Sequence, residues 1–431
     1  MIKYAALVAV ALVLSVSGAL GLSRDAGTAT SPPTVDVPGA DATVAQAVAA
    51  LEEQVRRVPG DHRAWADLGL AYFEEAGITF DQDLYAKADA AVERSLQIQP
   101  QDNVAALANG AAISASHHDF VAALDQADAA LAIAPYDPIA LGIRVDALTQ
   151  LGKFGQQLVA VRTADRRQPG VGTTSRYSYA VELRGHLDRA RTMLMSATDT
   201  TNRTDLAHLL SHAADLDRRQ GRLNAAQDKL DRALEAVPGD TDSLAGLALL
   251  DTARGDLDGA VVRWRQIVDT TPLPEHFIEL GETLDALGRD EEAQQAYDDS
   301  VTAVHVLEAA GANIDLELAL FLADHGSAEQ ALPLAEAEWA RSKGIHAADG
   351  MAWVLHANDR DREALRYARL ATRLDTQEPS LWAHRGIIES ALGMTHTART
   401  HLQKSLTMDP GESPWQRAQA QSALRALRAE R

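Results

Sequence analysis

The sequence predicts an all-α solenoid made of repeats of about 34 residues. Prolines recur at this spacing: Pro100 and Pro135 are 35 residues apart, Pro135 and Pro169 are 34 apart, and Pro238 and Pro272 are again 34 apart. A glycine near the middle of each period and an alanine shortly after it keep the same frame. A fixed period of this length is typical of units that stack on their neighbours, and not of a single globular core.

Each period predicts two antiparallel helices. The central glycine should end the first helix in a left-handed conformation, which glycine adopts at little cost. The alanine lets the two helix backbones approach closely, and the proline stops the second helix. The glycines expected in this role are Gly152, Gly221, Gly255, Gly288, Gly326 and Gly393. The alanines expected at the helix contact are Ala123, Ala226, Ala260, Ala293, Ala331, Ala364 and Ala398.

The first unit carries the most complete copy of the pattern, which reads Trp65-x2-Leu68-Gly69-x2-Tyr72, then Ala88, then Pro100. This resembles the tetratricopeptide repeat, whose pattern is W-x2-L-G-x2-Y, then A-x3-F, then P. A later unit is similar, with Phe277, Leu280, Gly281 and Leu284 in the same frame. The resemblance implies a right-handed superhelix in which the first helices line a concave groove that receives a peptide or a helix.

The repeat array is expected to span residues 43–412 and to contain about ten helix pairs. Residues 43–58 are predicted to form a single helix before the first pair. Residues 413–431 are predicted to form a capping helix that covers the apolar face left open at the end of a solenoid. The alternative is an ordinary helical bundle whose prolines align by chance.

The composition limits the classes of partner. The net charge is −21, and an acidic surface repels phosphates, so no nucleic-acid partner is expected. The chain has no cysteine, which excludes disulfides, cysteine zinc sites and thiol catalysis. The acidity either favours a basic partner or is only a solvated surface.

Residues 1–22 are predicted to be a transmembrane anchor or a signal peptide. After Lys3, residues 4–22 form an uncharged run of 19 residues, which is long enough to cross a bilayer. Lys3 would hold the N-terminus inside, so the array would lie outside the cytoplasm on a single-pass anchor. Cleavage near Ala19 would instead give a secreted protein. Residues 23–42, rich in Thr, Ser and Pro, are predicted to be a disordered linker.

The sequence contains no motif that indicates catalysis. It has no phosphate-binding loop, no nucleophile elbow and no H-E-x-x-H zinc motif. His208 and His212 have a spacing that could hold a metal, but no third ligand is indicated, so exposed histidines are the favoured interpretation. We therefore expect no catalytic residue, no cofactor and no metal, in a protein that is not an enzyme.

The expected function is a non-enzymatic scaffold that binds a protein or peptide in the groove, at the outer face of the cytoplasmic membrane. An accessory or substrate-delivery subunit of an envelope enzyme or export complex is the alternative. Carried onto the repeat frame, the resemblance gives these groove candidates: His208, His212 and Asp215; Glu275, Glu279, Glu282 and Asp285; His346, Trp353 and His356. The four acids either bind a basic segment or are a solvated face, and Trp353 either anchors a ligand or packs in the core.

Overall fold

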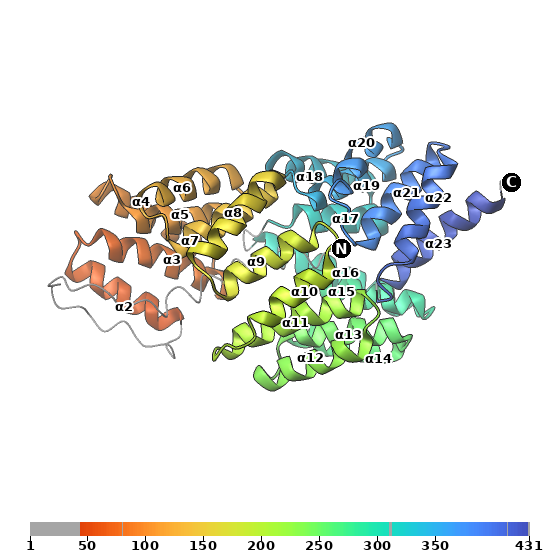
Figure 1. Cartoon of the computed structure of the whole chain (residues 1–431), viewed down its shortest axis with the longest axis horizontal. Helices are drawn as coiled ribbons and strands as arrows, with labels where there is room; N and C mark the ends of the chain where they lie inside the picture. Colours follow the sequence, from red (N-terminus) through yellow and green to blue (C-terminus); the bar gives the residue numbers. More distant parts are fainter. Residues whose placement is uncertain (1–43, 80, 310–312, 412, 430–431) are drawn as a thin grey trace. The chain divides into compact units, whose positions relative to one another are not determined.

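The computed structural model describes residues 44–79, 81–309, 313–411 and 413–429 (Figure 1). Within these ranges, the regular elements are the α-helices α2 to α23, with no strand among them. The contacts divide the chain into two compact units. The N-terminal unit runs to residue 172 and includes residues 307–313, and the C-terminal unit contains residues 173–306 and 314–431.

The N-terminal unit contains one single helix and three helix pairs. The single helix α2 (Val44–Arg57) buries Val48, Leu51 and Val55 and packs against α3. The pairs are α3 (His62–Thr79) with α4 (Gln82–Ile98), α5 (Val104–Ser116) with α6 (Phe120–Ile133), and α7 (Pro138–Gln150) with α8 (Phe154–Arg167).

The C-terminal unit contains seven helix pairs and the single helix α23 (Pro414–Ala429). The pairs are α9 (Val171–Glu182) with α10 (Leu187–Ser196), α11 (Arg203–Arg219) with α12 (Leu223–Ala236), α13 (Thr241–Arg254) with α14 (Leu257–Thr270), α15 (Pro274–Ala286) with α16 (Asp290–Ala309), α17 (Asp315–His325) with α18 (Ala328–Arg341), α19 (Ile345–Ala357) with α20 (Asp361–Ala371), and α21 (Pro379–Ala391) with α22 (Thr395–Leu406). The predicted all-α array of ten helix pairs is confirmed.

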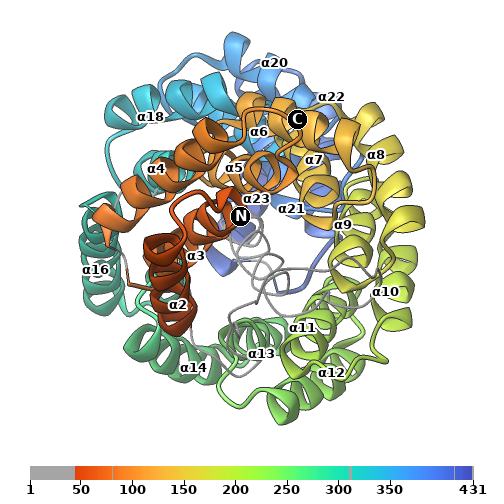
Figure 2. The ribbon, with the colours of Figure 1, turned by 90° about the vertical axis from the view of Figure 1, so that its left-hand side faces the viewer.

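In the C-terminal unit, the second helices of the pairs lie outside the first helices. Figure 2 shows α10, α12, α14 and α18 on the outside and α11, α13 and α21 nearer the inside. Helix α19 packs against α20 of its own pair and against α21 of the next pair, as in a stacked repeat. Helix α23 packs against α21 and α22, and also against the more distant α15.

The alanine positions are confirmed, and the glycine positions are confirmed with one exception. All seven predicted alanines have no exposed surface. Five of the six glycines have a positive φ, between 64° and 81°. Gly326 does not, because its φ is −137°. A Cβ at Gly326 would come within 2.8 Å of the Leu322 side chain, so crowding, and not handedness, explains this glycine.

A polar pair recurs between the two helices of successive units. Three first-helix carboxylates accept hydrogen bonds from second-helix side chains: Asp217 from Lys229 Nζ at 2.5 Å, Asp251 from Arg263 Nε at 2.6 Å, and Asp285 from Tyr297 Oη at 2.6 Å. The partners of each pair are 12 residues apart, and successive pairs are 34 residues apart. The repeat therefore preserves an internal polar contact as well as an apolar one.

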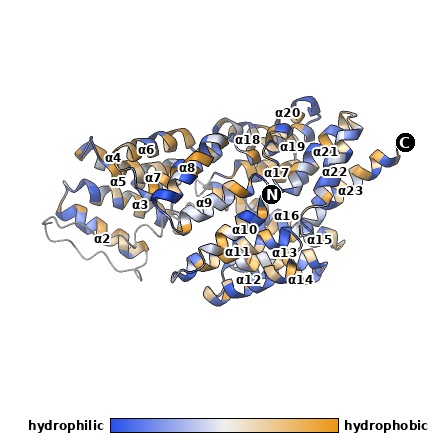
Figure 3. Ribbon diagram, in the orientation of Figure 1, coloured by the Kyte–Doolittle hydropathy of each residue, from blue (hydrophilic) through white to orange (hydrophobic). Residues whose placement is uncertain are grey.

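The helices have mixed polarity along their length. Figure 3 shows hydrophobic and hydrophilic residues interleaved along the described helices. None of these helices has both the length and the apolar character needed to cross a bilayer. The predicted anchor (residues 1–22) and linker (residues 23–42) lie outside the described residues.

The close approach of α15 and α16 can be tested at Gly281. A Cβ there would come within 2.4 Å of the Tyr297 ring, which Asp285 holds by its hydroxyl group. We expect Gly281→Ala to destabilise the protein by about 1–3 kcal/mol, measured by calorimetry. The control is Gly155→Ala in α8, where a Cβ meets nothing within 4 Å and the helix gains up to about 1 kcal/mol. Equal melting temperatures for the two variants would contradict the tight contact.

Candidate peptide-binding face

The first helices α11, α13, α15 and α17 form a surface that we call the first-helix face. A segment near the C-terminus of the chain lies on it. Asp409 accepts a hydrogen bond from Arg218 at the end of α11. Beside it, Gly411 lies so close to α13 that a Cβ would come within 2.7 Å of the Leu249 carbonyl oxygen.

The same segment continues to α17. The ring centroids of Trp415, in the first turn of α23, and of His325, at the end of α17, are 4.6 Å apart. Helix α23 also packs against α15. Because Asp409, Gly411 and the start of α23 between them reach all four first helices, the first-helix face holds part of the chain itself.

Arg218 is the charged centre of this contact. Its side chain is only 4% exposed and pairs with Asp215 through Nη2 at 2.6 Å and with Asp409 through Nη1. Although burial opposes the charge, the two carboxylates raise the pKa of Arg218, so the guanidinium stays charged. Its Nε is buried and has no hydrogen-bond acceptor among the described residues.

A second buried network lies beside Arg218. Glu182 of α9 accepts hydrogen bonds from Arg219 Nη1 at 2.5 Å and pairs with His212 Nε2 at 2.9 Å. Burial alone would raise the pKa of Glu182, but Arg219 and His212 outweigh it and lower that pKa. Arg219 also donates to the Gln377 carbonyl oxygen at 3.0 Å. These contacts join α9 and α11 to the segment before α21.

The other end of the first-helix face carries carboxylates. Asp242, Glu275 and Glu317 lie in the first turns of α13, α15 and α17, and we call them the acidic row. Asp242 is exposed, and the other two are half-buried. Among the described residues, no lysine or arginine forms an ion pair with any of the three.

Ionisation of the acidic row is unfavourable in the unbound protein. Burial, followed by repulsion from Glu338 and Glu275, raises the pKa of Glu317 to about 8. The surrounding protein, followed by repulsion from Asp240, raises the pKa of Asp242 to about 6, although the side chain keeps contact with solvent. Burial also raises the pKa of Glu275. A carboxylate at a helix N-terminus is normally favoured by the helix dipole, so these shifts indicate that desolvation, the largest cause at all three groups, outweighs the dipole.

The predicted candidates on α11 have partners inside the protein. His212 pairs with Glu182, and this hydrogen bond raises the pKa of His212 against the effect of burial. Asp215 pairs with Arg218. The ring of His208 lies 6.4 Å from that of His212, and burial, followed by repulsion from His212, lowers the pKa of His208 to about 4, so it is neutral at pH 7. The binding role of all three stays a prediction.

The four predicted acids on α15 have different surroundings in the structure. Glu275 belongs to the acidic row. Glu282 is buried, with an oxygen 3.5 Å from His325 Nε2, and Asp285 accepts the hydrogen bond from Tyr297. Glu279 is half-buried. The four acids therefore do not form one uniform strip, because two of them bind neighbouring helices.

Trp353 lies between helices. It is 6% exposed, its Nε1 donates to Asp324 at 2.7 Å, and its ring stacks on that of His384 with centroids 3.9 Å apart. Of the two interpretations that the sequence left open, this position favours core packing.

The two predicted histidines of α19 lie next to carboxylates. His346 Nδ1 is 3.6 Å from Glu378 Oε2, and His356 Nδ1 is 2.5 Å from Asp361 Oδ1. Both histidines therefore have structural contacts at the edges of α19, and their role in ligand binding stays a prediction.

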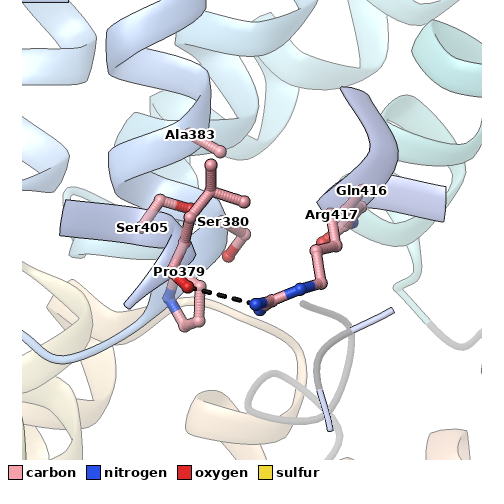
Figure 4. Close-up of a pocket in the computed structure, with 7 residues that line it drawn as sticks. Pro379, Ser380, Ala383, Ser405, Gln416 and Arg417 are labelled. Carbon is pink, nitrogen blue, oxygen red and sulfur yellow. Dashed lines mark hydrogen bonds between the residues drawn. The ribbon is translucent and has the colours of Figure 1, made fainter. Parts of the chain in front are cut away.

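A small pocket lies between α21, α22 and α23 (Figure 4). It is lined by Pro379, Ser380, Ala383, Ser405, Leu406, Gln416 and Arg417. Arg417 donates to the Leu406 carbonyl oxygen at 3.1 Å, and Gln416 Oε1 is buried without a donor among the described residues. The volume of about 10 Å³ suits a single water molecule. None of the predicted candidates lines it.

The described part of the chain contains no group of three His, Asp or Glu side chains placed to hold a metal ion. His208 and His212 are thus not joined there by a third ligand. The expectation of a protein without a cofactor stays a prediction.

Sequence reasoning missed four residues of the first-helix face. Asp242 and Glu317 occupy the first turns on either side of Glu275, so comparison of equivalent helix positions would have found them. Arg218 and Asp409 are 191 residues apart, and no local pattern connects them.

The comparisons with known proteins find solved structures that are similar to this chain in fold. No family model and no curated protein matches the chain. Among solved structures, the human IFIT1 dimer with PPP-AAAA is 12% identical over 84% of this chain and 86% of that one, with a TM-score of 0.47. Yeast Tom70 is 14% identical over 84% and 96%, with a TM-score of 0.35. TTC0263, a TPR protein of Thermus thermophilus, is 23% identical over 42% and 94%, with a TM-score of 0.37.

The repeat pattern and the helix pairs of the described residues define the fold class of this chain as an all-α solenoid of the tetratricopeptide-repeat type.

Glu74 provides a test of buried charge in the N-terminal unit. It is 3% exposed, and neither carboxylate oxygen has a hydrogen-bond donor among the described residues. Burial raises its pKa from 4.5 to about 7. The folded protein therefore holds this proton more tightly than the unfolded chain, and stability falls as the pH rises from about 4.5 through 7.

We expect Glu74→Gln to be more stable than the parent at pH 8, by about 1–3 kcal/mol, and no more stable at pH 4. Denaturant unfolding at the two pH values measures the difference. Glu75→Gln, at the half-exposed neighbouring position, is the control. The same pH dependence for both variants would show that Glu74 is not the group responsible.

Proposed function

We propose that this protein is a non-enzymatic scaffold that binds a basic segment of a partner protein at the acidic row of its first-helix face. The observation that carries the proposal is the set of uncompensated carboxylates on three successive first helices. Their raised pKa values mean that ionised Asp242, Glu275 and Glu317 are unfavourable in the unbound protein. A lysine or arginine from a partner would offset the cost of ionising these carboxylates, so binding energy and specificity would come from the same ion pairs.

An accessory or substrate-delivery subunit of an envelope enzyme or export complex is the second candidate. It uses the same face, and the identity of the captured protein distinguishes the two. Substrate turnover by the purified chain would contradict the non-enzymatic role in both cases.

We place the protein at the outer face of the cytoplasmic membrane in this proposal. The support is the sequence of residues 4–22 and the position of Lys3 before it.

The acidic row can be tested with neutral variants of similar shape. We expect Asp242→Asn/Glu275→Gln/Glu317→Gln to capture the partner at least about ten-fold less well than the parent, because the carboxylates that a basic segment would pair with are lost. Crosslinked capture by the full-length protein in native membranes, followed by mass spectrometry, measures this. The same variant should be more stable than the unbound parent at neutral pH and above, because it no longer has to ionise carboxyl groups whose pKa the folded protein raises.

The matched control removes three exposed acids from first turns of the second helices: Asp258→Asn/Glu291→Gln/Glu329→Gln, in α14, α16 and α18. It changes the net charge and the helix-end charges by the same amount. Equal capture by the two triple variants would rule out the acidic row as the binding site.

Removal of residues 1–22 tests the proposed location. We expect the shortened chain to move from the membrane fraction to the soluble fraction of the cell, because it lacks the apolar run. N-terminal sequencing of the full-length protein distinguishes a retained anchor from a signal cleaved near Ala19. Membrane association that persists in the shortened chain would contradict the anchor.

A further inference from the structure

The far end of the first-helix face already holds a chain segment in the manner of a bound peptide. Three described residues, Asp409, Gly411 and Trp415, make the contacts there. Asp409 pairs with the buried Arg218, Gly411 lies against the main chain of α13, and Trp415 packs on His325. A charge pair, a close backbone contact and an aromatic anchor are the contacts by which segments are recognised at protein surfaces.

Residues 409–415 leave Arg218 incompletely bound. Asp409 uses one oxygen, Oδ1, for Arg218, and this oxygen also accepts a hydrogen bond from the Gly411 N–H at 2.9 Å. Asp215 occupies Nη2, and the buried Nε has no acceptor among the described residues. An unpaired buried donor costs about 1–3 kcal/mol, so a segment that supplies a second acceptor binds this guanidinium better.

The remainder of the C-terminus has its own attachment. Ala420, Leu424 and Leu427 of α23 pack against the apolar surface of α21 and α22. The contact with Arg218 is therefore separate from the apolar contact that caps the last repeat.

We propose that Arg218, with the adjoining surface of α13 and His325, is a binding site for an acidic peptide segment of a partner, and that the contacts of Asp409, Gly411 and Trp415 are those of an internal ligand which such a segment replaces. This proposal rests on the proposed use of the first-helix face for binding and adds a second site, of opposite charge to the acidic row. The partner segment carries an Asp or Glu that pairs with Arg218, a small residue near it, and an aromatic residue for His325.

The internal ligand keeps the site closed in the absence of a partner. Because the internal ligand is attached to the chain on both sides, it competes with a free peptide for Arg218 at an effective concentration of about millimolar. A free peptide of the same sequence therefore binds poorly to the parent protein, and it binds well once the internal contact is weakened.

The test uses a fluorescent peptide with the sequence of residues 407–417 and the full-length protein, and measures binding by anisotropy. In the Asp409→Asn variant, Asn keeps the shape of the internal segment and removes its charge. We expect this variant to bind the peptide at least about ten-fold more tightly than the parent does. A peptide with Asn in place of its Asp should bind the same variant about ten-fold more weakly.

The control protein is Asp258→Asn, which loses an exposed carboxylate of α14 and should bind the peptide as the parent does. Circular dichroism and thermal melting establish that each variant is folded. If Asp409→Asn does not fold, Trp415→Ala removes the other anchor of the internal segment and serves in its place.

Two results would overturn the proposal. One is equally weak peptide binding by the parent and by the folded variant, which would make residues 409–415 a permanent structural contact. The other is equal binding of the Asp and Asn peptides, which would mean that Arg218 does not recognise a carboxylate. Because the probe is a defined peptide, neither result depends on the partner captured at the acidic row, and the two proposals can fail separately.

Discussion

The close approach of helix backbones at alanine and glycine is the constraint on which this structure depends. The predicted alanines are fully buried, and Gly281 leaves room only for the Tyr297 ring. A helix pair cannot bury its apolar side alone, so each unit depends on its neighbours. One core cluster runs continuously from α13 to α17, and another from α17 to α21.

Tight helix packing also determines where polar side chains can lie. Buried charges need partners, and the C-terminal unit supplies them between neighbouring first helices. Glu182 pairs with His212 between α9 and α11, and Asp349 pairs with His384 at 3.0 Å between α19 and α21. The acidic row has no lysine or arginine partner, and the buried Nε of Arg218 has no acceptor, among the described residues, which is why both proposals concern them.

The periodic part of the structure was predictable from sequence, and the contacts between distant repeats were not. Proline, glycine and alanine act locally, so their spacing gave the helix pairs. Asp285 was assigned to the groove. One repeat earlier, Asp251 pairs with Arg263 of the second helix, so the equivalent position of Asp285 indicated a partner in its own second helix. Gly326 was misjudged because its backbone is not left-handed, with a φ of −137°, so it does not end its helix in the expected way.

The pair Arg218–Asp409 changes the connectivity of the C-terminal unit. A solenoid with contacts only between neighbours behaves as a line, which can fray from either end. A buried link between residues 191 positions apart turns the part between α11 and α23 into a closed loop of contacts. Local opening that releases Asp409 then has to break a buried contact on α11 as well, which opposes fraying from the C-terminal end of the array.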